Sequence, residues 1–418
     1  MIPEFAYFFS LSCAFFYVFV KKRQLDLFSV SAICAFLYSY PLFFGVIYDP
    51  GANSYVKISD VIYYFYSVFF ILLVGFAVIF DFLYKKIKIR MGRNLHCAPK
   101  TMLGIMLVFS CVLFFMVLVF GLDDLLKDGK SGLVSLGILF TVFSWSVLTF
   151  FSYAQFSGIK HYSLFAFLLI FFLLFVGSRS YFATSLIIFV LVYFKDKDSF
   201  RLVMNIKLLF FGFSLVVFLV FYKVLYQDIF SLDFSGALSK SSNLSILAYR
   251  VLDGSESTLI MSNFNNSIHG FEKNGSNDYY FLGLFFRLFP FFSDYISSFF
   301  GYELSRYSSV IMKEFYPGVS YGMGASFWGE AIYGGGFLGL ALFLMFYFVL
   351  VFLGSWVIVV RAPDFLKSFL LVPFSYVAFY IHRIEFSFVI YVFCICIFLM
   401  CFYFFVYLFL KRGVYEGG

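Results

Sequence analysis

Arginines placed between apolar runs are the residues of this chain best suited to chemistry. The five of interest are Arg179, Arg250, Arg287, Arg306 and Arg383. Arg179 and Arg383 stand at the tips of short apolar segments, and the other three lie in one long polar stretch, residues 227–325. A guanidinium group stays protonated and holds phosphate oxygens through paired hydrogen bonds. We therefore predict that all of them except Arg306 contact an anionic substrate.

Two carboxylates are candidates for a general base, Glu330 first and Glu256 second. Glu330 precedes three consecutive glycines, residues 334–336, which are expected to break a helix before the next apolar run. The piece before the break is predicted to be a short helix that dips into the outer leaflet. A carboxylate at that depth is costly unless it faces a cavity, and a carboxylate in a low-dielectric cleft suits the role of a base.

Aromatic residues accompany Glu330 on both sides. Trp328 and Tyr333 flank it closely, and Tyr321 precedes it by nine residues. This pattern resembles a sugar-binding surface, where ring faces stack on sugars and a carboxylate accepts hydrogen bonds from hydroxyl groups. We assign Tyr321 and Tyr333 to substrate binding. Helix packing alone would explain the glycines but not the acidic residue among aromatic ones.

The arginines also have structural alternatives. Glu385 follows Arg383 closely and would neutralise it if the two side chains pair. Arg179 and Arg383 would extend to lipid headgroups if they do not line a protein cavity. Ser180 is expected to cap the helix after Arg179, which would aim backbone N–H groups at an anion.

The composition indicates an all-α polytopic membrane protein. Of 418 residues, 63% are hydrophobic and 13% charged, which leaves too little polar surface for a soluble domain of this size. The net charge of +7 reflects loop topology rather than binding to nucleic acid. No cysteine lies in the long polar stretch, no CxxC pattern occurs, and the four histidines are scattered. We therefore expect no disulfide framework, no metal site and no cofactor.

Apolar runs predict about eleven transmembrane helices. The runs are 4–20, 25–48, 58–84, 101–120, 132–157, 162–177, 180–194, 207–226, 337–360, 368–381 and 386–410. They divide the chain into an N-terminal bundle of about eight spans (1–226), a long outer loop with short helices (227–336) and a C-terminal bundle of about three spans (337–418).

The loops between the runs sort by charge. Most Lys and Arg residues fall in one alternate set of loops: 21–23, 85–100, 160, 195–207, 361–367 and 411–412. Cationic loops stay on the cytoplasmic side, so this set and the C-terminus are expected inside. The N-terminus and the stretch 227–325 are then expected outside.

The order of these features resembles the Wzy-type O-antigen polymerases of bacteria. The matching pieces are Gly177-Ser178-Arg179, the long outer loop with Phe286-Arg287-Leu288-Phe289-Pro290, the re-entry from Ser326 to Gly339, and Arg383. The resemblance in architecture extends over most of the chain, and the sequence motifs that carry it are short. Related O-antigen ligases carry a His where this chain has Ala325, which favours a polymerase. A Lys-Pro pair frequent in such polymerases after the Arg…Pro element is missing here.

The resemblance implies a glycosyltransferase in the bacterial inner membrane, with its active face in the periplasm. Its donor and acceptor would be oligosaccharide repeats linked to undecaprenyl pyrophosphate, and a chain-length regulator is an expected partner. Arginines would stabilise the pyrophosphate leaving group. Other functions stay open: an O-antigen ligase, a peptidoglycan-type polymerase, and a flippase of the same lipid-linked sugars. Transporters often show two similar halves, and no internal repeat is evident here.

Overall fold

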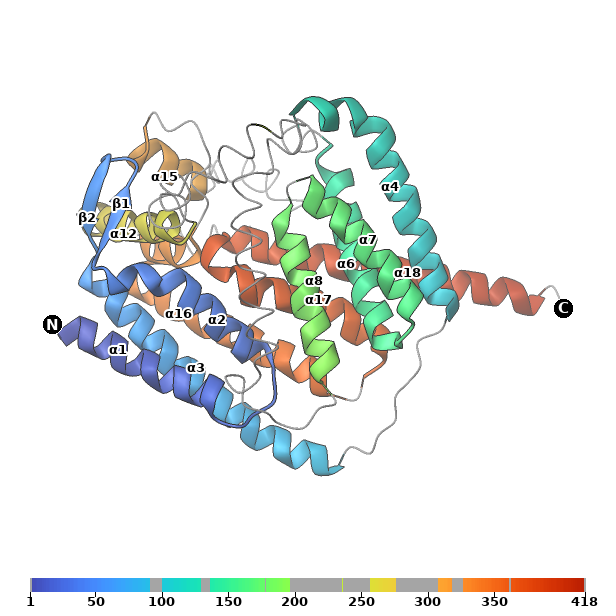
Figure 1. The fold of residues 1–418 in the computed structure, drawn as a ribbon, viewed down its shortest axis with the longest axis horizontal. Coiled ribbons are helices and arrows are strands. Elements are labelled where there is room, and N and C mark those ends of the chain that lie inside the picture. Colours follow the sequence, from blue (N-terminus) through green and yellow to red (C-terminus); the bar gives the residue numbers. More distant parts are fainter. Residues whose placement is uncertain are drawn as a thin grey trace.

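A computed structural model of the chain describes residues 2–90, 100–128, 136–176, 178–195, 235, 256–275, 307–317, 326–360 and 362–416 (Figure 1). This part is helical except for one hairpin and the connections. Outside it lie the predicted span 207–226 and, among the residues assigned to the site, Arg250, Arg287 and Tyr321. Arg306 lies outside it as well.

The described elements follow the alternation of apolar and polar sequence. In chain order they are α1 (Ile2–Phe15), the π-helix η1 (Phe16–Val20), α2 (Leu27–Ser39), the 3₁₀ helix η2 (Tyr40–Phe43), β1 (Val46–Asp49), β2 (Ser54–Lys57), α3 (Asp60–Arg90), α4 (Lys100–Asp128), α6 (Ile138–Ser157), α7 (Lys160–Phe175), α8 (Arg179–Phe194), α12 (Glu256–Asn274), α15 (Tyr307–Phe315), α16 (Phe327–Val359), α17 (Asp364–Tyr380), the 3₁₀ helix η3 (Ile381–Arg383) and α18 (Phe386–Glu416).

Seven of the described helices are long and apolar enough to cross a membrane. They cover residues 2–20, 60–85, 100–121, 138–157, 327–359, 364–383 and 386–411. Three shorter apolar helices, at 27–43, 160–175 and 179–194, coincide with three more of the predicted runs. The prediction of a helical multi-pass membrane protein is confirmed. The count of eleven spans and the long outer loop stay predictions.

The predicted span 25–48 ends earlier than expected. Helices α2 and η2 stop at Phe43, and Gly45 then takes a left-handed conformation (φ +71°) that leads into the hairpin. Strands β1 and β2 are antiparallel, with Val46 opposite Lys57. At the turn, the Asp49 side chain accepts a hydrogen bond from the N–H of Gly51 at 3.0 Å, an Asx-type contact that stabilises such turns.

One end of the molecule, which we call the hairpin end, collects β1, β2, α12 and α15 (Figure 1, upper left). Two glycines allow α12, α15 and α16 to approach each other there. A Cβ atom on Gly270 would lie 2.7 Å from the ring of Tyr333, and one on Gly329 would lie 2.3 Å from the hydroxyl of Tyr307. A larger residue at either position would require these neighbouring side chains to shift.

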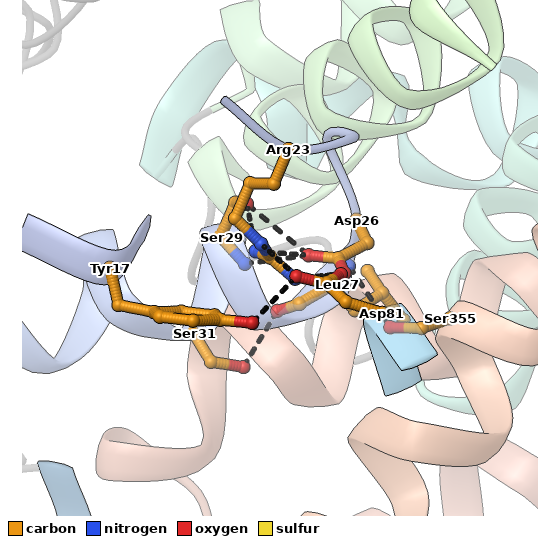
Figure 2. A network of polar contacts seen from close by, with 8 residues as sticks. All are labelled: Tyr17, Arg23, Asp26, Leu27, Ser29, Ser31, Asp81 and Ser355. Atoms are coloured by element: carbon orange, nitrogen blue, oxygen red, sulfur yellow. Dashed lines mark hydrogen bonds and ion pairs between the residues drawn. The ribbon is translucent and has the colours of Figure 1, made fainter. Parts of the chain in front are cut away.

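The other end of helices α1 and α2, which we call the Arg23 end, is held by a buried charged network (Figure 2). Arg23 pairs with Asp26 at 2.7 Å and with Asp81 at 3.2 Å, and the Tyr17 hydroxyl donates to Asp81 at 2.8 Å. Asp26 also caps α2 by accepting from the N–H of Ser29 at 3.1 Å. Burial alone would lower the pKa of Arg23, but the two carboxylates raise it above its ordinary value.

Further contacts gather chain segments at the Arg23 end. The Gln24 side chain donates to the carbonyl of Lys195 at 2.9 Å, and the N–H of Leu27 donates to Ser355 Oγ at 3.2 Å. The loop after η1, the end of α8 and the last turn of α16 therefore meet at one end. That the loops 21–23, 195–207 and 361–367 lie on the cytoplasmic side stays a prediction.

The helix break predicted at the three glycines is observed within α16. Gly336 has φ +61° and ψ −154°, a backbone conformation that L-residues with a side chain rarely adopt. A Cβ atom here would lie 2.7 Å from the ring of Phe271 on α12. Residues 327–335 thus form a separate helical piece before the long apolar part of α16, and its depth in a membrane stays a prediction.

Candidate anion-binding site

Two of the predicted arginines meet on one carboxylate at the hairpin end. Arg179 Nη2 donates to Glu256 Oε1 at 2.8 Å, and Arg383 Nη1 donates to Glu256 Oε2 at 2.5 Å. The three side chains carry two positive charges and one negative charge. Their exposed fractions are 27%, 37% and 26% for Arg179, Arg383 and Glu256, so a solute can reach them.

Three element ends that are far apart in sequence bring these groups together. Arg179 is the first residue of α8, Arg383 ends η3, and Glu256 is the first residue of α12. An acidic residue in the first turn of a helix also interacts favourably with the helix dipole. The prediction that Ser180 caps α8 is wrong, because α8 begins earlier and Ser178 stands at the cap position without a side-chain bond.

Helix α12 is anchored at several points other than Glu256. A buried polar cluster with hydrogen bonds of 3.0–3.4 Å holds its middle: Asp49, Ser262, Asn266 and Tyr316. Nearer its start, Ser257 Oγ donates to the carbonyl of Leu37 at 2.7 Å. The N–H of Ser59 donates to Asn265 Oδ1 at 2.9 Å. The polar face of α12 thus docks against the hairpin, α2 and the start of α3.

A buried histidine fixes the turn that carries Arg383. The His382 ring is fully buried and stacks between Tyr38 and Tyr66, with centroid distances of 5.2 and 5.9 Å. Trp328 Nε1 donates to His382 Nδ1 at 2.9 Å. An indole N–H can only donate, so Nδ1 is the acceptor and the proton of the neutral ring lies on Nε2. No sequence pattern indicates this role, since the four histidines are scattered.

Glu330, the first candidate for the base, lies in a different environment. Its side chain is almost fully buried, and Oε2 accepts a hydrogen bond from the N–H of Phe386 at 2.7 Å, at the first turn of α18. Such a contact satisfies a free N–H group at the start of a helix. Its neighbour Trp328 is fully buried as well, which excludes the predicted stacking of its ring face on a sugar.

Tyr333 lies away from the arginine pair. Its hydroxyl donates to Glu314 Oε2 at 2.6 Å on an exposed surface, and its ring packs against Gly270 near the far end of α12. From Glu256 to Gly270 a helix rises by about 21 Å. The structure therefore does not bring Tyr333 together with the arginine pair.

The geometry also answers whether Arg383 is neutralised by Glu385, the alternative that the sequence left open. Arg383 pairs with Glu256 on α12. Glu385 accepts from the N–H of Ser308 at 2.7 Å, in the first turn of α15, and from the Ser387 hydroxyl at 3.4 Å. Glu385 thus caps a neighbouring helix, and the positive charge of Arg383 stays available at the site.

The described residues hold no group of three or more His, Cys, Asp and Glu side chains arranged to bind a metal ion. No protein-family model, no curated protein and no solved structure matches this chain. The arrangement at Arg179, Glu256 and Arg383 is therefore the main guide to function. Chemically it can bind an anion with two oxygens and place a carboxylate beside it.

Proposed function

We propose that this protein polymerises oligosaccharide repeats linked to undecaprenyl pyrophosphate by glycosyl transfer. The observation that carries the proposal is the convergence of Arg179 and Arg383 on one carboxylate, at a place that solutes can reach. Two guanidinium groups around a two-oxygen anion are what a pyrophosphate linkage requires. Their origin in the two predicted short loops supports the resemblance to the Wzy-type polymerases.

In the proposed reaction, a sugar hydroxyl of the acceptor attacks C1 of the donor glycan. The bond from C1 to the pyrophosphate oxygen breaks, and the lipid pyrophosphate leaves with the electron pair. Arg179 and Arg383 stabilise the charge that develops on it, which lowers the barrier without proton transfer to the leaving group. Arg250 and Arg287 are proposed to contact further phosphate or acidic sugar groups, and Tyr321 and Tyr333 to contact the glycan.

Glu256 is the better candidate for the base that takes the hydroxyl proton. Its carboxylate lies beside the proposed pyrophosphate site and is partly exposed. Glu330 is almost fully buried and bound to a backbone N–H, so an incoming hydroxyl has less access to it. A general base must lie within hydrogen-bond reach of the proton that it removes, and this favours Glu256.

We propose that the protein lies in the bacterial inner membrane with the hairpin end in the periplasm and the C-terminus in the cytoplasm. The sorting of Lys and Arg among the loops supports this orientation. A phosphatase active only outside the cytoplasm, fused after residue 418, should stay inactive, and the same enzyme inserted at the hairpin turn should be active. The reverse result would invert the orientation.

The test of the function is the polysaccharide ladder of a deletion strain, complemented with wild type, Arg179→Ala or Arg383→Ala. We expect the deletion to leave single repeats on their acceptor and remove the ladder, and we expect neither variant to restore it. Lys57→Ala is the matched control, because Lys57 is a highly exposed cation on the hairpin and should restore the ladder. Loss of single repeats as well would indicate a ligase or a flippase, and a chain-length regulator should change only the ladder's length distribution.

A further inference from the structure

The carboxylate of Glu256 occupies the position that a bound anion would take. Each of its two oxygens receives a hydrogen bond from a different guanidinium group, at 2.8 and 2.5 Å. A phosphate group presents its oxygens to two arginines in the same manner. The protein thus contains its own occupant of the site, covalently attached at the start of α12.

This pairing is not needed to dock α12. The contacts of Ser257 with Leu37 and of Asn265 with Ser59, together with the buried cluster around Asp49, hold the helix independently. The Glu256 side chain can therefore leave the arginines while the helix stays in place. The partial exposure of all three side chains leaves room for a change of the Glu256 rotamer.

We propose that the anionic group of the donor exchanges with the Glu256 carboxylate on Arg179 and Arg383, and that this exchange frees Glu256 to act as the base. The inference rests on the proposed function. It orders the reaction: the donor binds first, and only then can the acceptor hydroxyl lose its proton.

The two guanidinium charges explain why Glu256 can act as a base only after the exchange. A carboxylate held by two guanidinium groups is a poor proton acceptor, because both cations stabilise its charged form. Once the donor pyrophosphate takes over the arginines, the released carboxylate accepts the proton of the attacking hydroxyl. The new bond forms between that oxygen and C1, and the bond from C1 to pyrophosphate breaks. The leaving pyrophosphate stays on the arginines until it departs. Glu256 then releases the proton to water and returns to the arginines as a carboxylate.

The test is the binding of inorganic pyrophosphate to the full-length protein in lipid nanodiscs, measured by calorimetry. The decisive variant is Glu256→Asp, which keeps the negative charge but withdraws the carboxylate by one methylene group. We expect Glu256→Asp and Glu256→Gln to bind pyrophosphate about tenfold more tightly than wild type, since the internal competitor is weakened or removed. Glu272→Gln removes an exposed carboxylate from the same helix and should leave the affinity unchanged.

Two results would overturn the exchange in distinguishable ways. If Glu256→Asp binds no more tightly than wild type while Arg179→Ala and Arg383→Ala lose binding, the anion site stands and Glu256 is only a structural partner. If both arginine variants bind pyrophosphate as wild type does, the anion site of the proposed function is refuted, and the exchange with it. For the base, Glu256→Gln should bind pyrophosphate tightly yet form no polymer from lipid-linked repeats, and normal polymerisation by this variant would refute that role.

Discussion

The two ends of this molecule each hold arginine and carboxylate groups, but in opposite balance. At the Arg23 end one guanidinium is shared by two carboxylates, and the side chains of Arg23 and Asp26 are only 2% and 3% exposed (Figure 2). At the hairpin end two guanidinium groups share one carboxylate, and all three side chains are partly exposed. The first cluster has no positive charge left for a ligand, and the second has a surplus that a ligand can reach.

The difference separates a structural role from a functional one. A buried charge must be paired with good geometry, since an unpaired one is strongly destabilising. The Arg23 network meets this need, because it links the loop after η1 to α2 and α3. A partly exposed pair contributes little to stability. The arginine pair around Glu256 is therefore better explained by binding than by stability.

The largest effect on stability should come from the Arg23 end. We expect Arg23→Ala to lower the free energy of unfolding by about 3 kcal/mol, because Asp26 and Asp81 would keep their charges without the shared cation. Unfolding of the purified protein by denaturant in detergent micelles measures this change. Lys22→Ala is the control, since Lys22 is the exposed neighbour in the same loop. A loss below about 1 kcal/mol for Arg23→Ala would show that the network is not a structural tie.

The hairpin end should show the reverse pattern, with function lost and stability kept. We expect Arg383→Ala to lower the rate of polymerisation of synthetic lipid-linked repeats about a hundredfold, as the loss of one donor to a developing anion does in other enzymes. Its free energy of unfolding should change by less than about 1 kcal/mol. Arg383→Lys should restore only part of the rate, because an ammonium group cannot form the paired bonds of a guanidinium.

Sequence reasoning found the arginines but not their partners. Arg179 and Arg383 were identifiable because a charge at the tip of a short apolar run is rare and costly. Their common partner, Glu256, follows a polar stretch without periodicity, so nothing in the sequence links it to either arginine. Glu330 was ranked first because it stands in a conspicuous Gly-rich and aromatic context. The structure places its carboxylate, almost fully buried, against the N-terminus of α18.

The helices of the fold were predictable from the sequence, but the hairpin and the tertiary ion pairs were not. Long apolar runs have one stable form in a bilayer, so the helices and the break at Gly336 followed from composition and glycines. The hairpin after Gly45 is not evident from the sequence, because its strands are short and the apolar run 25–48 continues into β1. The pairing of Asp26 and Asp81 with one arginine depends on tertiary contacts, which no local pattern encodes.

Weakening the docking of α12 should have an intermediate effect on both the free energy of unfolding and the pyrophosphate affinity. Asp49→Ala removes the acceptor for Ser262 and Asn266, which are buried, so we expect a loss of about 1–2 kcal/mol in the free energy of unfolding. Because Glu256 begins the same helix, pyrophosphate affinity should change too, which links this cluster to the site. Asp60→Ala is the matched control, since Asp60 is an exposed acid at the start of α3. A loss of stability without any change in affinity would mean that the position of α12 does not determine the site.

The smallest effect, and the most direct comparison of the two clusters, is the response to salt. Glu256→Ala leaves two partly exposed guanidinium groups near each other, which should cost about 0.5 kcal/mol at low ionic strength. Raising the salt from about 0.05 M to about 0.5 M screens exposed charges, so this cost should approach zero. The cost of Arg23→Ala should change little over the same range, because the Arg23 and Asp26 side chains are almost fully buried. Equal salt dependence at both ends, measured by the same unfolding titrations, would show that the two clusters do not differ in access to solvent, and the distinction between them would fail.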